Sequence, residues 1–318
     1  MRNGNVVPVR PFGKTGESVS CIGLGGSHIG DPELSKQEAV RLIRDAIDQG
    51  ITFLDNSWDY NDGESERRMG LALKDGYRSK AFLMTKIDGR TAKAATAQLE
   101  ESLRRLKTDY VDLLQHHEVI RYEDADRIAA EGGAGEALEK ARKSGKCRYV
   151  GFTGHKDPQI HLYMLAIARR AGLRLDAVQM PLNVMDAHYR SFERNVLPQL
   201  VKDGCAVLGM KAFGHGVLLK SKAISAEECL QYVLNLPVSV VITGIDSSKL
   251  LKQAVRIASE FRPLSAATVK KILARTKDAA IEGKYELFKT SAHYDATAEN
   301  PEWLGEELPQ VSRLAKSA

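Results

Sequence analysis

The feature that most constrains the fold is an eightfold alternation of short apolar runs with amphipathic stretches. Successive runs begin about 30 residues apart, which is the length of one strand with its crossover helix. The runs show little period-two alternation, as strands buried on both faces do. Strict alternation of such units favours a closed (β/α)8 barrel, with an open doubly wound sheet as the alternative. The expected strands are Val19–Leu24, Ile51–Leu54, Ala81–Thr85, Val111–Gln115, Arg148–Phe152, Asp176–Met180, Ala206–Met210 and Ser239–Thr243.

Two of the amphipathic stretches show helical spacing most clearly. Residues 35–50 carry one apolar stripe and end at a glycine, the residue type that most often follows a helix. Residues 91–109 carry a second stripe, in which a serine takes one of the positions. The stripes consist of Ala39, Leu42, Ile43, Ala46 and Ile47 in the first stretch, and of Ala95, Leu99, Ser102, Leu103 and Leu106 in the second.

Segments at both ends of the chain fall outside the repeat. Residues 6–20 indicate a β-hairpin that turns at residues 13–16 and closes the bottom of the barrel. Leu264–Ile281 is expected to form one more helix. Residues 283–310 are irregular and aromatic, and they form either a surface tail or a flap over the substrate pocket. We expect one domain made of the hairpin (1–18), the barrel (19–262) and the C-terminal helix with its tail (263–318).

Composition argues against several classes of function. The formal charge of +5 comes from 46 basic and 41 acidic residues, and no basic run suggests a nucleic-acid partner. No apolar stretch approaches the roughly 20 residues of a membrane span, and the first residues lack the apolar core of a signal peptide. The four cysteines are scattered, without a C-x-x-C pair. These observations predict a cytoplasmic protein with reduced cysteines.

Four residues just past the apolar runs are the strongest candidates for chemistry. Asp55 and Tyr60 follow the second run, Lys86 follows the third, and His117 follows the fourth. If the runs are neighbouring strands of one parallel barrel, these side chains meet at its C-terminal mouth. A phenol, an ammonium, a carboxylate and an imidazole together make a proton donor with a tunable pKa. No two of the four have metal-ligand spacing, so we expect no metal.

Over nearly its whole length the chain resembles the aldo-keto reductases. The resemblance implies a single (β/α)8 barrel that binds a nicotinamide cofactor without a Rossmann fold, and the absence of G-x-G-x-x-G agrees with this. The most specific part is the spacing of Asp55 to Tyr60 together with the helix that follows. The matching motifs are CIGLGG at residues 21–26, FLDNSWDY at 53–60, GESERRMGLAL at 63–73, MTKI at 84–87, YVDLLQHH at 110–117, RYVGF at 148–152 and VQMPLN at 178–183.

The four candidates then take defined roles. Tyr60 is expected to protonate a carbonyl oxygen while hydride arrives from the cofactor. Lys86 would lower the pKa of Tyr60 from its ordinary value near 10, and Asp55 would keep Lys86 charged. His117 would donate a hydrogen bond to the same oxygen. The family pattern selects His117 rather than His116, and the two should point to opposite faces of their strand.

The chain departs from the family at several cofactor positions. Many members carry Ser-Asn where this chain has Thr153 and Gly154, and in them the Asn side chain binds the carboxamide of the nicotinamide. Thr153 and His155 are expected to substitute for that side chain. Met210 stands where members place a tyrosine that stacks on the nicotinamide. Lys211 is expected to contact the pyrophosphate, with a structural lysine and a Schiff-base lysine as alternatives. Taken together, the expected cofactor-binding residues are Gly25, Gly26, Asp55, Thr153, Gly154, Gln179, Met210, Lys211, Ala212, Phe213, Gly214, Gly216, Gly244, Asp246, Ser247, Lys249 and Gln253, and the expected substrate-binding residues are Trp58, His117 and His155.

The cofactor preference has a weaker basis in the sequence. NADP(H) is the first candidate on family grounds, with NAD(H) as the alternative. The positions of the family's 2′-phosphate clamp hold Gly244 and Leu250, which are uncharged. Lys249 is close enough in sequence to compensate, as are Lys252 and Arg256, whereas a carboxylate such as Asp246 near the ribose favours an unphosphorylated 2′-hydroxyl.

The sequence therefore predicts an NAD(P)H-dependent carbonyl reductase that acts on a small aldehyde or ketone. A second hypothesis is a cofactor-binding regulatory or redox-sensing subunit with slow turnover, since potassium-channel β-subunits share this fold and these four residues. We expect a monomer or a small homo-oligomer without nucleic-acid or membrane partners. The identity of the substrate does not follow from the sequence.

Overall fold

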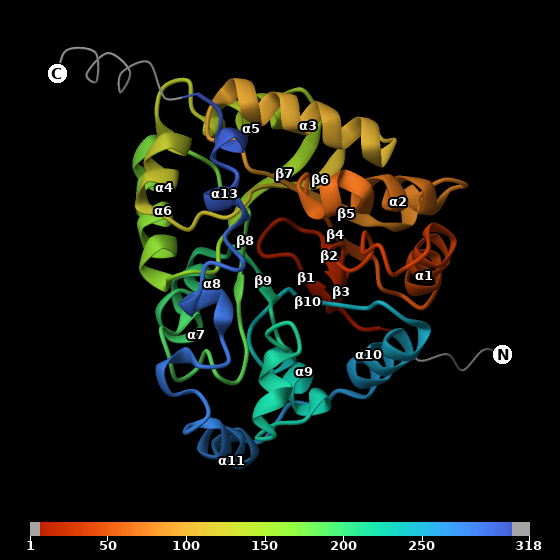
Figure 1. The fold of residues 1–318 in the computed structure, drawn as a ribbon, viewed down its shortest axis with the longest axis vertical. Coiled ribbons are helices and arrows are strands. Elements are labelled where there is room, and N and C mark those ends of the chain that lie inside the picture. Colours follow the sequence, from red (N-terminus) through yellow and green to blue (C-terminus); the bar gives the residue numbers. More distant parts are fainter. Residues whose placement is uncertain (1–6, 307–318) are drawn as a thin grey trace.

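Eight parallel strands close into a barrel in the computed structural model, which describes residues 7–306. Their order around the barrel is β10-β3-β4-β5-β6-β7-β8-β9, so each strand pairs with its neighbours in the chain and the last closes on the first. Helices surround the strands in a ring (Figure 1). The predicted (β/α)8 barrel is confirmed. The barrel strands are β3 (Ile22–Gly25), β4 (Phe53–Asp55), β5 (Phe82–Ile87), β6 (Val111–His116), β7 (Cys147–Thr153), β8 (Ala177–Pro181), β9 (Ala206–Met210) and β10 (Val240–Thr243).

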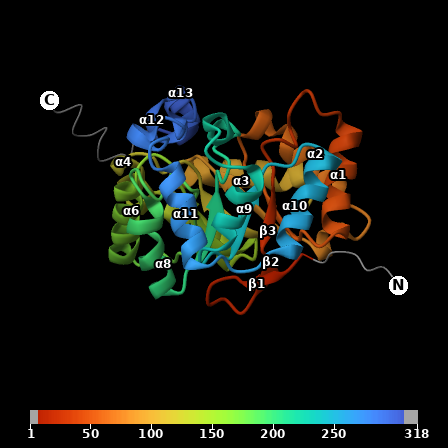
Figure 2. The same ribbon diagram turned by 90° about the horizontal axis from the view of Figure 1, so that it is seen from below.

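The hairpin that precedes the barrel seals the N-terminal ends of the strands. Strand β1 (Val9–Pro11) pairs antiparallel with β2 (Ser18–Ser20), so the first barrel strand begins only at Ile22, three residues later than expected. Phe12 follows β1, is fully buried, and has its ring centroid 4.8 Å from that of Phe82, the first residue of β5. Figure 2 shows the hairpin at one end of the molecule and the C-terminal helices α12 and α13 at the other. The predicted closure of the barrel bottom is confirmed for residues 7–20, and residues 1–6 lie outside the described part.

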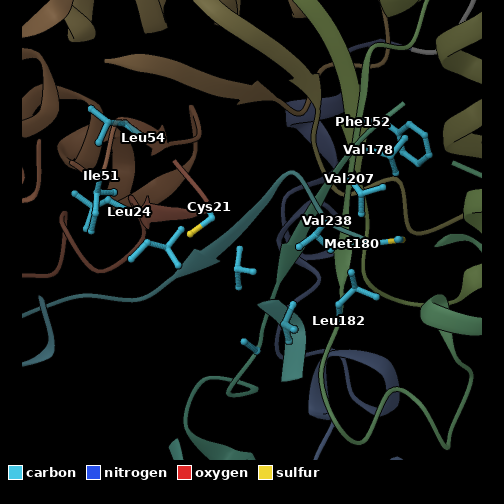
Figure 3. Close-up of a cluster of buried hydrophobic side chains, with 14 of the residues drawn as sticks. Cys21, Leu24, Ile51, Leu54, Phe152, Val178, Met180, Leu182, Val207 and Val238 are labelled. Atoms are coloured by element: carbon cyan, nitrogen blue, oxygen red, sulfur yellow. The ribbon is translucent and has the colours of Figure 1, made fainter. Parts of the chain in front are cut away.

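Two apolar layers hold the barrel together. Successive residues of a strand point to opposite faces, so Phe53 of β4 faces the barrel interior while Leu54 faces the helices. The inner layer joins Phe12 to residues at the N-terminal ends of the strands. The outer layer lies between strands and helices, where Leu54, Val178 and Met180 belong to one buried cluster (Figure 3). Strands buried on both faces explain why the sequence shows continuous apolar runs.

The helices between the strands follow the sequence pattern closely. Every residue of the stripe predicted for residues 35–50 is buried in α1, and Ser35 and Glu38 form a capping box at its start. All members of the second predicted stripe are buried in α3, together with Gln98. The helices are α1 (Lys36–Asp48), α2 (Glu64–Ala72), α3 (Ala92–Leu106), α4 (Tyr122–Ala129), α5 (Ala134–Lys143), α6 (Pro158–Ala171), α7 (Phe192–Asn195), α8 (Leu197–Asp203), α9 (Ala226–Leu234), α10 (Ser248–Glu260), α11 (Ala266–Thr276), α12 (Leu287–Thr290) and α13 (Ala296–Glu299), with 3-10 turns η1 (Tyr60–Gly63), η2 (Tyr77–Lys80), η3 (Val217–Ser221), η4 (Ile281–Gly283) and η5 (Pro301–Leu304).

The C-terminal segment lies at the mouth of the barrel. Helix α11 ends at Thr276, five residues earlier than predicted, and the chain continues through short helical turns. Lys289 is fully buried and anchors this segment, because its Nζ lies 2.6 Å from Asp186 Oδ1 and 3.1 Å from Glu286 Oε2. Of the predicted irregular segment, residues 307–310 lie outside the described part. Within residues 7–306, no helix has the length and apolar character needed to cross a membrane.

Candidate active site

The four predicted residues meet at the C-terminal mouth of the barrel. Asp55 ends β4 and Lys86 lies in β5, which places Lys86 Nζ 2.6 Å from Asp55 Oδ1. The same ammonium lies 3.0 Å from the phenol oxygen of Tyr60. The ring of His117 stands edge-on to the ring of Tyr60, with the centroids 5.8 Å apart. A carboxylate, an ammonium and a phenol therefore form a continuous chain, with an imidazole beside its end.

A sharp turn directly follows Tyr60 and leads the chain into α2. The residues of this turn, Asn61, Asp62 and Gly63, all have left-handed backbones with φ of 53°, 52° and 79°. Asn, Asp and Gly are the residue types that adopt this conformation most readily. The amide of Trp58 donates to Lys86 O at 3.0 Å, which ties this loop to β5. The local sequence thus accounts for the placement of the phenol beside the ammonium.

The expected lowering of the pKa of Tyr60 is not found. Burial raises the pKa of Tyr60 well above 10, and the carboxylates of Asp55 and Asp59 raise it further. The ammonium of Lys86 at 3.0 Å does not reverse this, because that cation is itself paired with Asp55. The phenol therefore holds its proton more tightly than a free tyrosine does.

His117 has two acidic neighbours that the sequence reasoning missed. Its Nδ1 lies 3.0 Å from Asp88 Oδ1, 3.3 Å from Asp59 Oδ1 and 3.3 Å from Ser57 Oγ. The polar atoms of His117, Asp59 and Asp88 lie within 4.8 Å of one another. This closeness follows from the contacts of both carboxylates with Nδ1 of His117. Burial opposes a charged ring, but Asp59 and Asp88 outweigh it and raise the pKa of His117 to about 10. The prediction of no metal concerned the four original residues and stays a prediction.

His116 points away from the mouth, as the alternation along β6 requires. It is buried beside Leu138 of α5 and Met164 of α6. Burial lowers the pKa of His116 to about 3, so this ring is neutral. Of the two histidines, His117 is the one whose ring lies beside Tyr60.

A cleft of about 360 Å³ runs from Tyr60 to helices α9 and α10. Near Tyr60, the buried Gln179 Oε1 has no hydrogen-bond partner within residues 7–306, which suits a ligand amide. The far end is apolar. Of the predicted cofactor residues, the cleft is lined by Gly25, Asp55, Gln179, Met210, Lys211, Ala212, Phe213, Gly216, Gly244, Asp246 and Gln253. Tyr60, which was predicted to be catalytic, and Leu250, at an expected clamp position, line the cleft as well. The sequence reasoning missed the lining by Ser27, His28, His215, Leu219, Ala226, Leu230, Ile242, Thr243, Ala254 and Ile257.

Several predicted cofactor residues lie outside this lining for packing reasons. A Cβ on Gly154 would lie 2.2 Å from Val119 O, so this glycine accommodates the loop after β6. A Cβ on Gly26 would lie 2.4 Å from Asp55 O, which makes it a packing residue as well. Ser247 caps α10 by accepting a hydrogen bond from the amide of Leu250. The predicted residues that do not line the cleft are Gly26, Thr153, Gly154, Gly214, Ser247 and Lys249.

Lys211 lines the cleft without a carboxylate partner within 4.0 Å among residues 7–306. Its Nζ lies 3.2 Å from His215 Nε2 and 4.8 Å from the ring centroid of Tyr294 in the C-terminal segment. Burial lowers the pKa of Lys211 to about 8. This ammonium is available to an anionic group of a ligand.

The predicted substrate residues are covered by the C-terminal segment. Trp58 stands edge-on to Trp303, with the ring centroids 5.5 Å apart. His155 Nε2 lies 3.1 Å from Asp295 Oδ1, and burial lowers the pKa of His155 to about 4. The structure therefore favours the flap over the surface tail for the described residues of this segment.

The end of the cleft at α10 has few charges. Arg256 is paired with Glu227 at 2.7 Å and with Glu260 at 3.3 Å. Lys249 and Lys252 are exposed and do not line the cleft, whereas Asp246 does. The basic residues that were expected to compensate for the missing phosphate clamp are therefore not directed at this cleft.

Comparison with known proteins agrees with this geometry. The model of the aldo/keto reductase family matches residues 21–229, which include all four residues at the mouth. The chain belongs to the aldo/keto reductase family.

Relatives of this aldo/keto reductase match it over most of the barrel. L-galactose dehydrogenase of Arabidopsis thaliana is 28% identical over 299 residues, which cover 81% of this chain and 90% of that protein. Aldo-keto reductase YhdN of Bacillus subtilis is 32% identical over 198 residues, or 58% of this chain and 55% of that protein. The holo form of aldo-keto reductase AKR11C1 from Bacillus halodurans has a TM-score of 0.71 at 25% identity, covering 88% of this chain and 99% of that one.

Proposed function

We propose that this aldo/keto reductase is an NAD(P)H-dependent carbonyl reductase in which Tyr60 is the general acid. The observation that carries the proposal is the chain from Asp55 through Lys86 to Tyr60, at the end of a cleft long enough to approach α10. Such a chain delivers a proton to an oxygen at one fixed place. The free side-chain oxygen of Gln179 supports a nicotinamide carboxamide at the same end.

The residues at the mouth divide the work of carbonyl reduction. A bound reduced nicotinamide would supply the hydride. As the carbonyl oxygen gains negative charge, Tyr60 gives it a proton, because an alkoxide is a far stronger base than a phenolate even when the pKa of the phenol is raised. The ammonium of Lys86 stabilises the phenolate from 3.0 Å, and Asp55 holds that ammonium in place. His117 binds the same oxygen and orients the substrate.

The cofactor is proposed to be NADP(H), as is typical of the family, with NAD(H) also accepted. The apolar lining by Leu230, Leu250 and Ile257 suits an adenine ring. We further propose the cytoplasm as its location, supported by four unpaired cysteines, and a monomer or small homo-oligomer as its state.

The proposed substrate is a small aldehyde or ketone. The match to a protein named L-galactose dehydrogenase makes sugars a first class to test, in the direction of oxidation as well as reduction. Trp58 and Trp303 at the covered mouth support a ligand with a flat or partly apolar face.

Steady-state reduction of an aldehyde, ketone, quinone and sugar panel tests the proposal. We expect continuous oxidation of NADPH with at least one class, and none with Tyr60→Phe. A regulatory subunit would instead bind NADPH, seen as a change in cofactor fluorescence, and turn over no class at an appreciable rate.

A further inference from the structure

The surroundings of His117 determine which of its ring nitrogens carries hydrogen. Nδ1 lies 3.0 Å from Asp88 Oδ1, 3.3 Å from Asp59 Oδ1 and 3.3 Å from Ser57 Oγ. An ionised carboxylate can only accept a hydrogen bond, so a nitrogen that faces two carboxylates acts as the donor. Nδ1 of His117 therefore carries a proton.

The other nitrogen, Nε2, is left for the substrate. Among residues 7–306, the polar contacts of the His117 ring all involve Nδ1. A neutral imidazole has one N–H group, and with that group at Nδ1 the Nε2 atom presents a lone pair. A lone pair repels a carbonyl oxygen. Nε2 can donate a hydrogen bond to that oxygen only when both ring nitrogens are protonated.

The charges around the ring favour this second proton. Asp88 is fully buried and Asp59 is half-buried, and Asp88 Oδ2 has no hydrogen-bond partner in the described part of the chain. Arg90 is close, but its guanidinium donates to the main-chain oxygens of Asp88 and His117. Beside a neutral ring, these two carboxylates would have no cation among residues 7–306 hydrogen-bonded to them, and unpaired charge in such surroundings is costly.

The other titratable groups near the ring do not change this balance. Tyr60 stands edge-on at 5.8 Å and is neutral in the free protein because its pKa is raised. Lys86 lies beyond Tyr60 and is paired with Asp55 at 2.6 Å. Glu118 adds a further carboxyl group, which accepts hydrogen bonds from amides of the C-terminal segment.

We propose that Asp88, assisted by Asp59, is a positioning residue that holds His117 as an imidazolium in the resting protein. The Nε2–H of this cation binds the carbonyl oxygen and places full positive charge where negative charge develops. The role toward substrate rests on the proposed carbonyl reductase function. The charge of His117 does not, since it is a property of the protein alone.

NMR titration of the imidazole rings, without cofactor, tests that charge directly. The His117 signal is identified by its loss in His117→Ala. We expect the ring to be protonated at about pH 8 and to titrate at least about two pH units lower in Asp88→Asn. Asp126→Asn removes a carboxylate that accepts from the hydroxyl of Tyr163 on the surface, and this control should leave the signal unchanged. A His117 ring that is neutral at about pH 7.5 in the unaltered protein overturns the proposal.

The pH profile of kcat for aldehyde reduction separates positioning from a merely structural role. At about pH 6 Asp88→Asn should retain kcat within about threefold, because the ring is protonated in both proteins. At about pH 9 it should lose at least tenfold, since the cation disappears as pH rises through the lowered pKa. An equal loss at every pH would make Asp88 structural and sink the proposal.

A second variant guards against misfolding, and one outcome separates the two proposals. If Asp88→Asn does not fold, Asp59→Asn allows the same comparison, because its carboxylate faces the same nitrogen. If the unaltered protein reduces no carbonyl but His117 titrates as expected, the reductase proposal fails while the charge of His117 stands.

Discussion

At the scale of single residues, the proton transfer proposed for Tyr60 depends on a phenol that is hard to ionise. Burial and nearby carboxylates raise the pKa of Tyr60, so its proton is present but leaves only toward a strong base. An alkoxide formed by hydride transfer is such a base, whereas water is not. This arrangement protects the proton until the substrate has reacted.

Removing the phenol hydroxyl should raise the energy of the transition state and leave cofactor binding unchanged. Tyr60→Phe should lower kcat by several orders of magnitude and leave the dissociation constant of NADPH within about threefold. Fluorescence titration and stopped-flow reduction measure the two quantities. A rate close to that of the unaltered protein would remove Tyr60 from its role as proton donor.

Lys86→Met should reduce the rate about as much as Tyr60→Phe, because the developing phenolate loses the cation 3.0 Å away. It should also lower the free energy of unfolding by roughly 3–5 kcal/mol, since Asp55 is left as a buried charge without its partner. Urea unfolding followed by circular dichroism measures the second effect. Unchanged stability would mean that Asp55 is protonated in the variant.

Lys211→Ala should weaken NADH and NADPH together, because a pyrophosphate contact is common to both cofactors. Its ammonium lines the cleft and stands over the ring of Tyr294. Dissociation constants for both cofactors provide the measurement. Equal binding before and after the change would assign Lys211 to the packing of the C-terminal segment.

The four residues at the mouth were predictable, but their acidic neighbours were not. Asp55, Tyr60, Lys86 and His117 follow strands in a spacing that the family shares. Asp88 comes two residues after Lys86, and only the packing of adjacent strands brings it to His117. The pKa of Tyr60 was misjudged for the same reason, since burial cannot be read from one strand at a time.

At the scale of elements, a buried cluster with more acidic than basic groups anchors the C-terminal segment, residues 284–306. Lys289 lies between Asp186 and Glu286, so one ammonium faces two carboxyl groups. Burial raises the pKa of Glu286 from its usual value of 4.5 to about 7. Between about pH 4.5 and 7, Glu286 is therefore more protonated when the C-terminal segment is packed on the barrel than when it is released. The packing of this segment accordingly weakens as pH rises through this window.

Hydrogen exchange of residues 284–306 should accordingly be faster at about pH 8 than at pH 5, after correction for the intrinsic exchange rate. Glu286→Gln should remove most of this difference, because the amide cannot ionise. A difference that persists in Glu286→Gln would assign the pH dependence to Asp186.

Long helices were predictable from sequence and short ones were not. The stripe of α1 was predicted residue by residue because thirteen residues repeat the pattern several times. Helices α12 and α13 have four residues each, too few to show a period. Buried contacts such as that of Lys289 with Asp186 hold this region, and these join residues about a hundred positions apart.

At the scale of the whole molecule, the distribution of charge decides which cofactor fits. The end of the cleft at α10, where the adenosine is proposed to bind, contains Asp246, while Arg256 is paired with two glutamates. A strong site for a 2′-phosphate needs a doubly charged or bidentate clamp. The described residues at this end offer none in the cleft.

We therefore expect measurable use of both NADPH and NADH, with at most about a hundredfold discrimination, or roughly 2.7 kcal/mol. Asp246→Ala should shift the ratio toward NADPH. Values of kcat/KM for both cofactors in both proteins measure this. Discrimination of several thousandfold would require a clamp that forms only on binding, and an unchanged ratio would show that Asp246 faces away from the ribose.

The barrel itself was predictable because strict strand-helix alternation repeated eight times has few other solutions. The cleft was harder to predict, because residues such as Leu230 and Ile257 reach it from helices whose inward stripes look like ordinary core. Only the placement of α9 relative to α10 shows that some residues of these inward stripes line the cleft.

The hairpin at the base of the barrel has a consequence for how the protein is made. Phe12 packs with Ala206, Leu208 and Val240, and the amide of Lys14 donates to Gly204 O at 2.9 Å. A ribosome synthesises the hairpin before the barrel strands, yet the residues against which it packs are complete only after Val240 has emerged. The hairpin is thus made before the strands but is among the last elements to dock, and until then the apolar residues at the base of the barrel stay accessible to chaperones.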